Sequence, residues 1–390
     1  AATARYLGPR ILTPRISPGT IRRLKPLSHV AGRMQVEVLM KTQSLSRISL
    51  RALLIGSVLS ILITATQAAD PVNPAVKPAA KPAAKFKVPK NEYGQPDLRG
   101  VWNFSSNTPL ERPARYQDRE FLTREEVEKQ HQQIVANSEV ADSSTGGGVG
   151  GYNQFWVESL AQDANMRTSL LVDPPNGRMP PLQAGIKSEN GGLGPDTGGQ
   201  RPVRFRVGGV RKDGPEDRGL SERCLMGFNS GPPFMPSMYN NNVQIFQAKN
   251  TVVLMTEMIH DARIVKIDSR PALDPSLSQW SGDSRGRFEG DTLIVETRNF
   301  TDKTNVFRGA GAGTTMELTE YFTRVGPDRV DYKFTVNDLK TFTKPFTALV
   351  PMIRADGEIY EYACHEGNYG MGNMLSGARQ EEAEATQKKK

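Results

Sequence analysis

The chain has 390 residues, enough for one large domain or two ordinary ones. Its 50 Lys and Arg outnumber its 42 Asp and Glu, but the excess lies at the start of the chain. Residues 1–69 carry ten basic residues and one acidic residue, Glu37, which leaves 40 basic and 41 acidic residues from Asp70 onward. That remainder has no basic stripe with interleaved aromatic residues, so we expect no nucleic-acid partner.

Residues 40–69 have the pattern of a secretory signal peptide. A basic stretch from Met40 precedes an apolar run over 52–65, and small residues before Asp70 suit cleavage. The run is shorter than the ~20 residues that span a bilayer, so we expect no stable membrane span once the signal is cleaved. We interpret residues 1–39, which are rich in Arg and Pro, as an extension that results from a translation start assigned too far upstream of Met40. The mature protein is then expected to be periplasmic or secreted.

The rest of the chain divides into a linker, one domain and a tail. Residues 70–92 are rich in Pro, Ala and Lys and predict an extended linker. A single β-rich domain is expected over 93–379, followed by a disordered tail over 380–390. One N-terminal helix is predicted near 123–137, because Thr123 and Glu126 form a capping box ahead of good helix formers.

Short apolar runs separated by tight turns dominate the chain from residue 243 onward. They predict four hairpins and one lone strand: 243–248 with 251–258, 286–289 with 292–297, 316–325 with 329–336, 343–354 with 358–364, and 262–267 alone. No helical pattern is interleaved, so we expect a mainly β fold, an antiparallel meander that forms a barrel or a sandwich. The 36 Gly and 27 Pro indicate long loops between its elements.

The mature part contains two cysteines, Cys224 and Cys364. In an oxidising compartment, an isolated pair most simply forms a disulfide. That bridge would bring the segment before the first hairpin next to the last predicted strand. A metal or nucleophile arrangement around Cys364 and His365 remains the alternative.

Five segments of the mature part are distinctive in sequence: PDLRGVWNF (96–104), PEDRGLSERCLMGFNSGPP (215–233), GDSRGRFEGDTLIVETRNFTDKT (282–304), ELTEYFTRV (317–325) and YEYACHEGN (360–368). They resemble a widespread group of exported, functionally uncharacterised bacterial proteins, over residues 96 to 379. The resemblance implies export and a β-rich fold, and it supplies no reaction. Gly100 and Trp102 are also similar to the opening of lipocalin-type, or calycin-like, barrels.

Two histidines of the mature part stand beside carboxylates at predicted strand ends, where scaffolds commonly present functional groups. The candidate catalytic residues are therefore Glu257, His260, His365 and Glu366. A His and a Glu can act as a general acid–base pair, which suits a hydrolase or a lyase. The same histidines with one carboxylate could hold a metal ion. No HxH or HExxH spacing is present, so we assign no metal, and any cofactor stays open.

A third alternative is a protein that binds a small ligand at the mouth of a barrel. The candidate ligand-binding residues are Arg223, Asn229, Tyr239, Asn241, Arg263, Trp280 and Asn368. Phe234, Met235 and Met238 are expected to line the mouth beside them. Glu320 shares a predicted strand face with apolar residues, so we expect either that it is buried with a partner or that the strand register is shifted.

The leading interpretation is an exported protein that recognises a small-molecule or carbohydrate-derived ligand. The alternative is a periplasmic hydrolase or lyase that uses a His/Glu pair, with or without the help of a metal.

Overall fold

The computed structural model describes residues 86–133, 166–186, 188, 212–268, 271–301, 307 and 313–389. All of them belong to one compact unit, Ala79–Lys390. The predicted signal peptide, the extension before it and the linker up to residue 85 lie outside the described residues.

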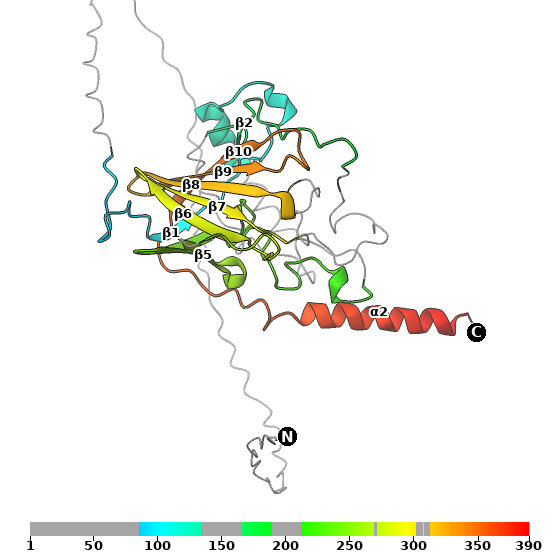
Figure 1. The fold of residues 1–390 in the computed structure, drawn as a ribbon. Helices are drawn as coiled ribbons and strands as arrows, with labels where there is room; N and C mark the ends of the chain where they lie inside the picture. The colour runs from blue at the N-terminus through cyan, green and yellow to red at the C-terminus, as the bar shows by residue number, and fades with distance from the viewer. Residues whose placement is uncertain are drawn as a thin grey trace, which may run out of the picture. The chain divides into compact units, whose positions relative to one another are not determined.

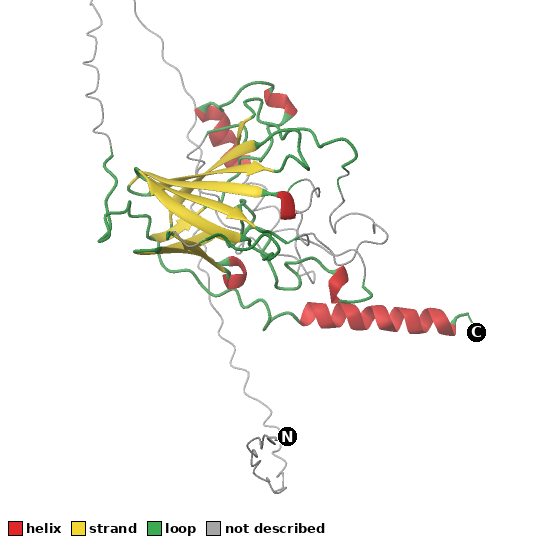
Figure 2. Cartoon of the chain, viewed as in Figure 1, coloured by secondary structure: helices red, strands yellow, loops and turns green. Residues whose placement is uncertain are grey.

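Nine strands of the described part close into a barrel (Figures 1 and 2). In spatial order they are β1 (Gly100–Asn103), β3 (Asn242–Ala248), β4 (Thr251–Thr256), β5 (Ala262–Lys266), β6 (Asp283–Glu289), β7 (Thr292–Arg298), β8 (Glu317–Gly326), β9 (Arg329–Asn337) and β10 (Phe346–Arg354). The short strand β2 (Leu171–Asp173) adds to β10. The predicted mainly β fold is therefore confirmed, in its barrel form.

Three of the four predicted hairpins form, namely β3–β4, β6–β7 and β8–β9. The fourth is wrong, because residues 358–364 contain no strand. One edge of β10 pairs with β9, and its other edge pairs with β2 at Ala348 and with β1 at Arg354. No edge is left for a hairpin partner.

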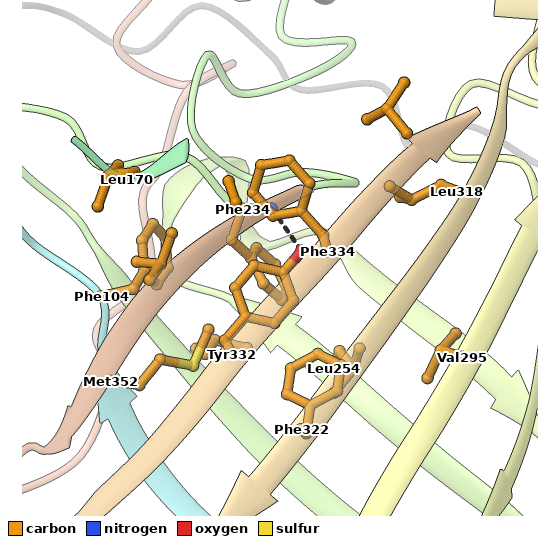
Figure 3. Close-up of a cluster of buried hydrophobic side chains, with 14 of the residues drawn as sticks. Phe104, Leu170, Phe234, Leu254, Val295, Leu318, Phe322, Tyr332, Phe334 and Met352 are labelled. Carbon is orange, nitrogen blue, oxygen red and sulfur yellow. Dashed lines mark hydrogen bonds between the residues drawn. The ribbon is translucent and has the colours of Figure 1, made fainter. Parts of the chain in front are cut away.

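Apolar side chains from the strands fill the barrel (Figure 3). In β9 the side chains of Val330, Tyr332, Phe334 and Val336 are all buried, as the alternation of the sequence predicts. The ring of Phe234 lies 5.4 Å from the rings of both Phe104 and Tyr332. Phe234 was expected at an open barrel mouth, but the structure places it in the core.

Phe234 belongs to a segment that we call the plug, residues 212–241, which precedes β3. The backbone N–H of Phe234 donates to the hydroxyl of Tyr332 at 3.1 Å (Figure 3). Met238, four residues later, is 60% exposed. The plug therefore inserts Phe234 into the core, packs Met235 partly against it and leaves Met238 in solvent.

Helices are few in the described residues. Residues 124–133 are helical, and the predicted capping box forms, with Thr123 N–H donating to Glu126 Oε2 (2.9 Å) and Glu126 N–H to Thr123 Oγ1 (3.2 Å). The other long helix, α2 (Tyr369–Gln387), was not predicted. It includes residues 380–387, which were expected in a disordered tail. None of the helices in the described part is long and apolar enough to cross a membrane.

Candidate functional site

The barrel wall is discontinuous between β5 and β6. These two strands run parallel and are joined at one residue pair, Lys266 with Arg285. The other neighbouring strands of the barrel are antiparallel. For example, β6 pairs with β7 along the whole length of both strands. The first half of β5 therefore has no strand partner on this side among the described residues.

The main chain of β5 turns polar groups toward this gap. The carbonyl of Asp261 accepts from Thr256 N–H at 2.9 Å, and Ile267 N–H donates to the carbonyl of Asn250 at 3.0 Å. The odd-numbered residues along β5 therefore form their main-chain hydrogen bonds with β4. Successive strand residues point their N–H and C=O groups to opposite edges. The main-chain groups of Ala262 and Ile264 consequently face β6.

A cavity of about 520 Å³ lies at this gap. Its lining comes from the start of β5, from the loop that leads into β6 and from the first two residues of β6: Asp261, Ala262, Arg263, Ile264, Ser278, Gln279, Trp280, Ser281, Gly282, Asp283 and Ser284. The volume falls within the range typical of small-molecule sites, and one aromatic residue stands among several polar ones.

The two carboxylates of the lining are held differently. Asp283 Oδ2 accepts from Arg285 Nε at 3.0 Å and from the backbone N–H of Leu273 at 3.1 Å. Asp261 Oδ2 accepts from the hydroxyl of Ser281 at 3.2 Å. Asp283 is thus paired with a cation, whereas Asp261 is bonded to a neutral group.

One side chain anchors the loop of residues 271–282, which carries Trp280. Asn299 Nδ2 donates to the carbonyl of Asp274 at 2.8 Å and to that of Leu277 at 2.9 Å. The backbone of Asn299 has φ +59°, a left-handed conformation that Asn tolerates better than most residues. Its carbonyl accepts from Gln279 N–H at 2.9 Å. Asn299 therefore fixes the loop from both its side chain and its main chain.

Arg263 joins the cavity to a buried polar network. Its guanidinium donates to both oxygens of Glu320, Nη1 to Oε2 at 2.5 Å and Nη2 to Oε1 at 2.9 Å. The hydroxyl of Tyr332 donates to Glu320 Oε1 at 2.8 Å. The expected partner of the buried Glu320 is therefore Arg263, supported by Tyr332.

The network fixes the protonation of its members. Burial acts to lower the pKa of Arg263, but the charge and hydrogen bonds of Glu320 outweigh it and raise that pKa above its ordinary value. Burial, followed by the negative charge of Glu320, raises the pKa of Tyr332 well above its ordinary value. Arg263 stays cationic and Tyr332 stays a donor.

The structure brings two of the predicted ligand-binding residues, Arg263 and Trp280, to the same cavity. Asn229 and Asn241 instead hold the plug together, since Asn229 Nδ2 donates to the carbonyls of Tyr239 (3.1 Å) and Asn240 (3.0 Å). Tyr239 packs edge-on against Phe228. These three residues do not line the cavity.

The predicted disulfide is confirmed: Cys224 and Cys364 are bonded, with their Cα atoms 5.9 Å apart. Asn368 caps α2 by accepting from Met371 N–H, and its Nδ2 donates to the carbonyl of Glu222 at 2.7 Å. Arg223 precedes Cys224 of the bridge, and its buried Nη1 has no hydrogen-bond partner among the residues that the structure describes. Arg223 and Asn368 thus belong to the disulfide region and not to the cavity.

Of the four candidate catalytic residues, the structure describes the side chains of Glu257, His365 and Glu366. His365 and Glu366 are exposed next to Cys364, and among described residues no hydrogen bond or ion pair joins His365 to a carboxylate. Glu257 is buried at the end of β4, where its Oε2 accepts from Asn242 Nδ2 at 2.8 Å. His260 lies in the short helix η4 (Met258–His260), and its side chain is outside the described residues. Catalysis by these residues stays a prediction.

Several residues of the cavity were not predicted from the sequence. Ser278, Gln279 and Ser281 line it, although none of them lies in a recognisable motif. Asn299 supports it from within the distinctive segment 282–304, which indicated no role for this residue. The one sequence signal of the three loop residues is position, since they flank Trp280 in a polar loop between two predicted strands.

No protein-family model, curated protein or solved structure matches the chain. Within the described residues, no group of three or more His, Cys, Asp or Glu side chains is arranged to hold a metal ion.

Proposed function

We propose that this protein is an exported β-barrel that binds a small-molecule or carbohydrate-derived ligand in the cavity between β5 and β6. The observation that carries the proposal is the cavity itself, about 520 Å³ in volume and lined by Trp280 and polar groups. Binding sites of this kind combine a concave surface with a few polar groups that orient the ligand.

Export is supported by two independent features. The signal-like pattern of residues 40–69 precedes the domain, and the domain holds a disulfide between Cys224 and Cys364. Such bridges persist in the periplasm and outside the cell, and they are rare in the cytosol. We therefore propose the periplasm or the cell exterior as the location, with the signal peptide removed.

A rigid support favours binding. Glu320, fully buried, fixes Arg263 behind the cavity, while Asn299 fixes the loop in front of it. A site built on groups already held in place loses little conformational entropy when a ligand binds.

The experiment is a thermal-shift screen of the oxidised mature protein against a library of sugars, amino acids, nucleosides and organic acids. Hits are then measured by calorimetry on two variants. Ala262→Trp fills the cavity from an exposed lining position, and Ala248→Trp is its control on the outer face of β3. We expect at least one ligand whose binding is abolished by Ala262→Trp and retained by Ala248→Trp. Absence of any hit, or hits that bind both variants equally, contradicts the proposal.

A further inference from the structure

We propose that the cavity between β5 and β6 takes a neutral saccharide unit, packed on Trp280 and bonded by Asp261, Gln279 and Ser281, and that it discriminates against acidic sugars. This inference rests on the function proposed above, and it names the class of ligand.

The filled barrel argues against a long apolar ligand. Barrels that carry such ligands need an empty interior, whereas here the interior is packed with side chains, including Phe234 from the plug (Figure 3). The available space lies in the wall, where half of the lining is polar. Ser278, Gln279 and Ser281 follow one another around Trp280 in the loop.

A pyranose ring matches this combination of groups. Its C–H faces are apolar and pack against the electron-rich face of an aromatic ring, while its hydroxyls point outward around the edge. Trp280 is partly exposed and lines the cavity, and we assign the packing face of the site to its indole ring. Each hydroxyl is both a donor and an acceptor, which suits a mixture of carboxylate, amide and hydroxyl side chains.

The main chain adds to this complementarity. Ala262 and Ile264 direct their N–H and C=O groups toward β6, and both line the cavity. A continuous ladder would pair these groups with β6. A ligand with hydroxyls at its edge can bond to a donor and an acceptor side by side, which a hydrocarbon cannot do.

The charges select a neutral ligand over an anion. Among the described residues of the lining, Arg263 is the one cation, and Glu320 already engages both of its terminal nitrogens. Asp283 is neutralised by Arg285. Asp261 accepts from the hydroxyl of Ser281 and places a carboxylate at the wall. A carboxylate accepts from sugar hydroxyls, and it repels the carboxylate of a uronic acid.

The test uses glucose, galactose, N-acetylglucosamine, cellobiose and chitobiose as probes, with glucuronate and galacturonate as their acidic counterparts. Binding to the oxidised mature protein is measured by calorimetry and by saturation-transfer NMR. We expect at least one neutral probe to bind, and its uronate to bind at least tenfold more weakly. A uronate that binds as tightly as its neutral parent overturns the proposal.

Variants assign the binding to the cavity. We expect Asp261→Ala, which removes a hydrogen-bonding carboxylate, and Trp280→Ala, which removes the packing face, each to weaken binding of the neutral probe by about tenfold or more. Asp261→Asn keeps the shape of the side chain and should reduce the discrimination against the uronate. Tyr360→Ala, at a position 79% exposed outside the cavity, is the control and should bind like the parent protein. Unchanged affinity in Trp280→Ala and Asp261→Ala overturns the proposal.

The two proposals fail in different ways. If no saccharide binds while another library compound binds and is blocked by Ala262→Trp, the saccharide inference is wrong and the proposed binding function stands. If no compound of any class is blocked by Ala262→Trp, both are wrong.

Discussion

The guanidinium of Arg263 in β5 and the carboxylate of Glu320 in β8 face each other inside the barrel and share two hydrogen bonds, of 2.5 and 2.9 Å. Glu320 is fully buried, and the side chain of Arg263 is 7% exposed. The geometry is bidentate, which gives orientation as well as energy. This pair therefore connects β5, which borders the cavity, to β8 across the interior of the barrel.

Loss of one member of the pair should destabilise the fold strongly. Glu320→Gln leaves the buried guanidinium without its counter-charge, so we expect the free energy of unfolding to fall by about 3–5 kcal/mol. The double variant Arg263→Met, Glu320→Leu removes both charges and should recover most of that loss. Urea denaturation measures both effects. A double variant no more stable than Glu320→Gln would contradict this account.

An exposed pair supplies the matched control. Arg287 Nη1 and Glu296 Oε1 lie 3.0 Å apart across β6 and β7, and both side chains are 49% exposed. We expect Glu296→Gln to lower the free energy of unfolding by no more than about 1 kcal/mol, because solvent screens the pair. A loss as large as that of Glu320→Gln would show that burial is not the cause.

Tyr332 should resist ionisation in the folded protein. Burial and the neighbouring charge of Glu320 raise its pKa in the folded state above the ordinary value of 10.0. The resulting stabilisation is complete below the pKa of the unfolded chain and is lost as the pH rises from there through the folded pKa. In an alkaline titration followed at 295 nm, one tyrosine should ionise only together with unfolding. That step should be missing in Tyr332→Phe, and its persistence there would refute the assignment.

Asn299 should control the mobility of the loop at the cavity. Asn299→Asp tolerates the same left-handed backbone but turns a carboxylate toward the carbonyls of Asp274 and Leu277. We expect faster hydrogen exchange in residues 271–282, by about one order of magnitude or more, since each lost bond is worth roughly 1 kcal/mol. Peptides from β9 serve as the internal reference, and Asn250→Asp in the exposed β3–β4 turn is the control variant. Unchanged exchange in the loop would exclude the anchoring role.

The disulfide should contribute substantially to stability. Cys224 and Cys364 are separated by 140 residues, and a bridge over such a distance restricts the unfolded chain. We expect the double variant Cys224→Ser, Cys364→Ser to lose about 2–5 kcal/mol in urea denaturation. Reductant should shift the parent protein to the same midpoint and leave the variant unaffected. Equal midpoints for the oxidised parent and the variant would contradict the prediction.

Local patterns in the sequence predicted the parts of the fold that depend on neighbours in the chain. The hairpins β3–β4, β6–β7 and β8–β9 follow from alternation and tight turns. The predicted fourth hairpin does not form because β10 pairs with β1 instead, with Trp102 opposite Arg354. Such competition between distant segments leaves no trace in the pattern of residues 358–364.

The candidate site shows the same division. Arg263 and Trp280 were identified because charged and aromatic residues near strand ends are conspicuous in a sequence. The cavity that unites them arises from the parallel contact of β5 with β6, a property of the barrel's closure. Asn299 was missed because its role depends on the conformation of a loop that precedes it by two strands. The burial of Glu320 with a partner was predicted, since an acid on an apolar face requires one.

The contact between β1 and β10 has a consequence for folding. Barrel closure joins Trp102 near the start of the domain to Arg354 near its end, so the last pairing must await nearly the whole chain. Contacts between residues so far apart in the sequence slow folding. They also leave truncated chains with open sheet edges, through which such chains are prone to associate. A domain with this topology can close its barrel only when both ends of the polypeptide are present. It is therefore better suited to fold after the whole chain has been delivered unfolded than to fold in successive pieces.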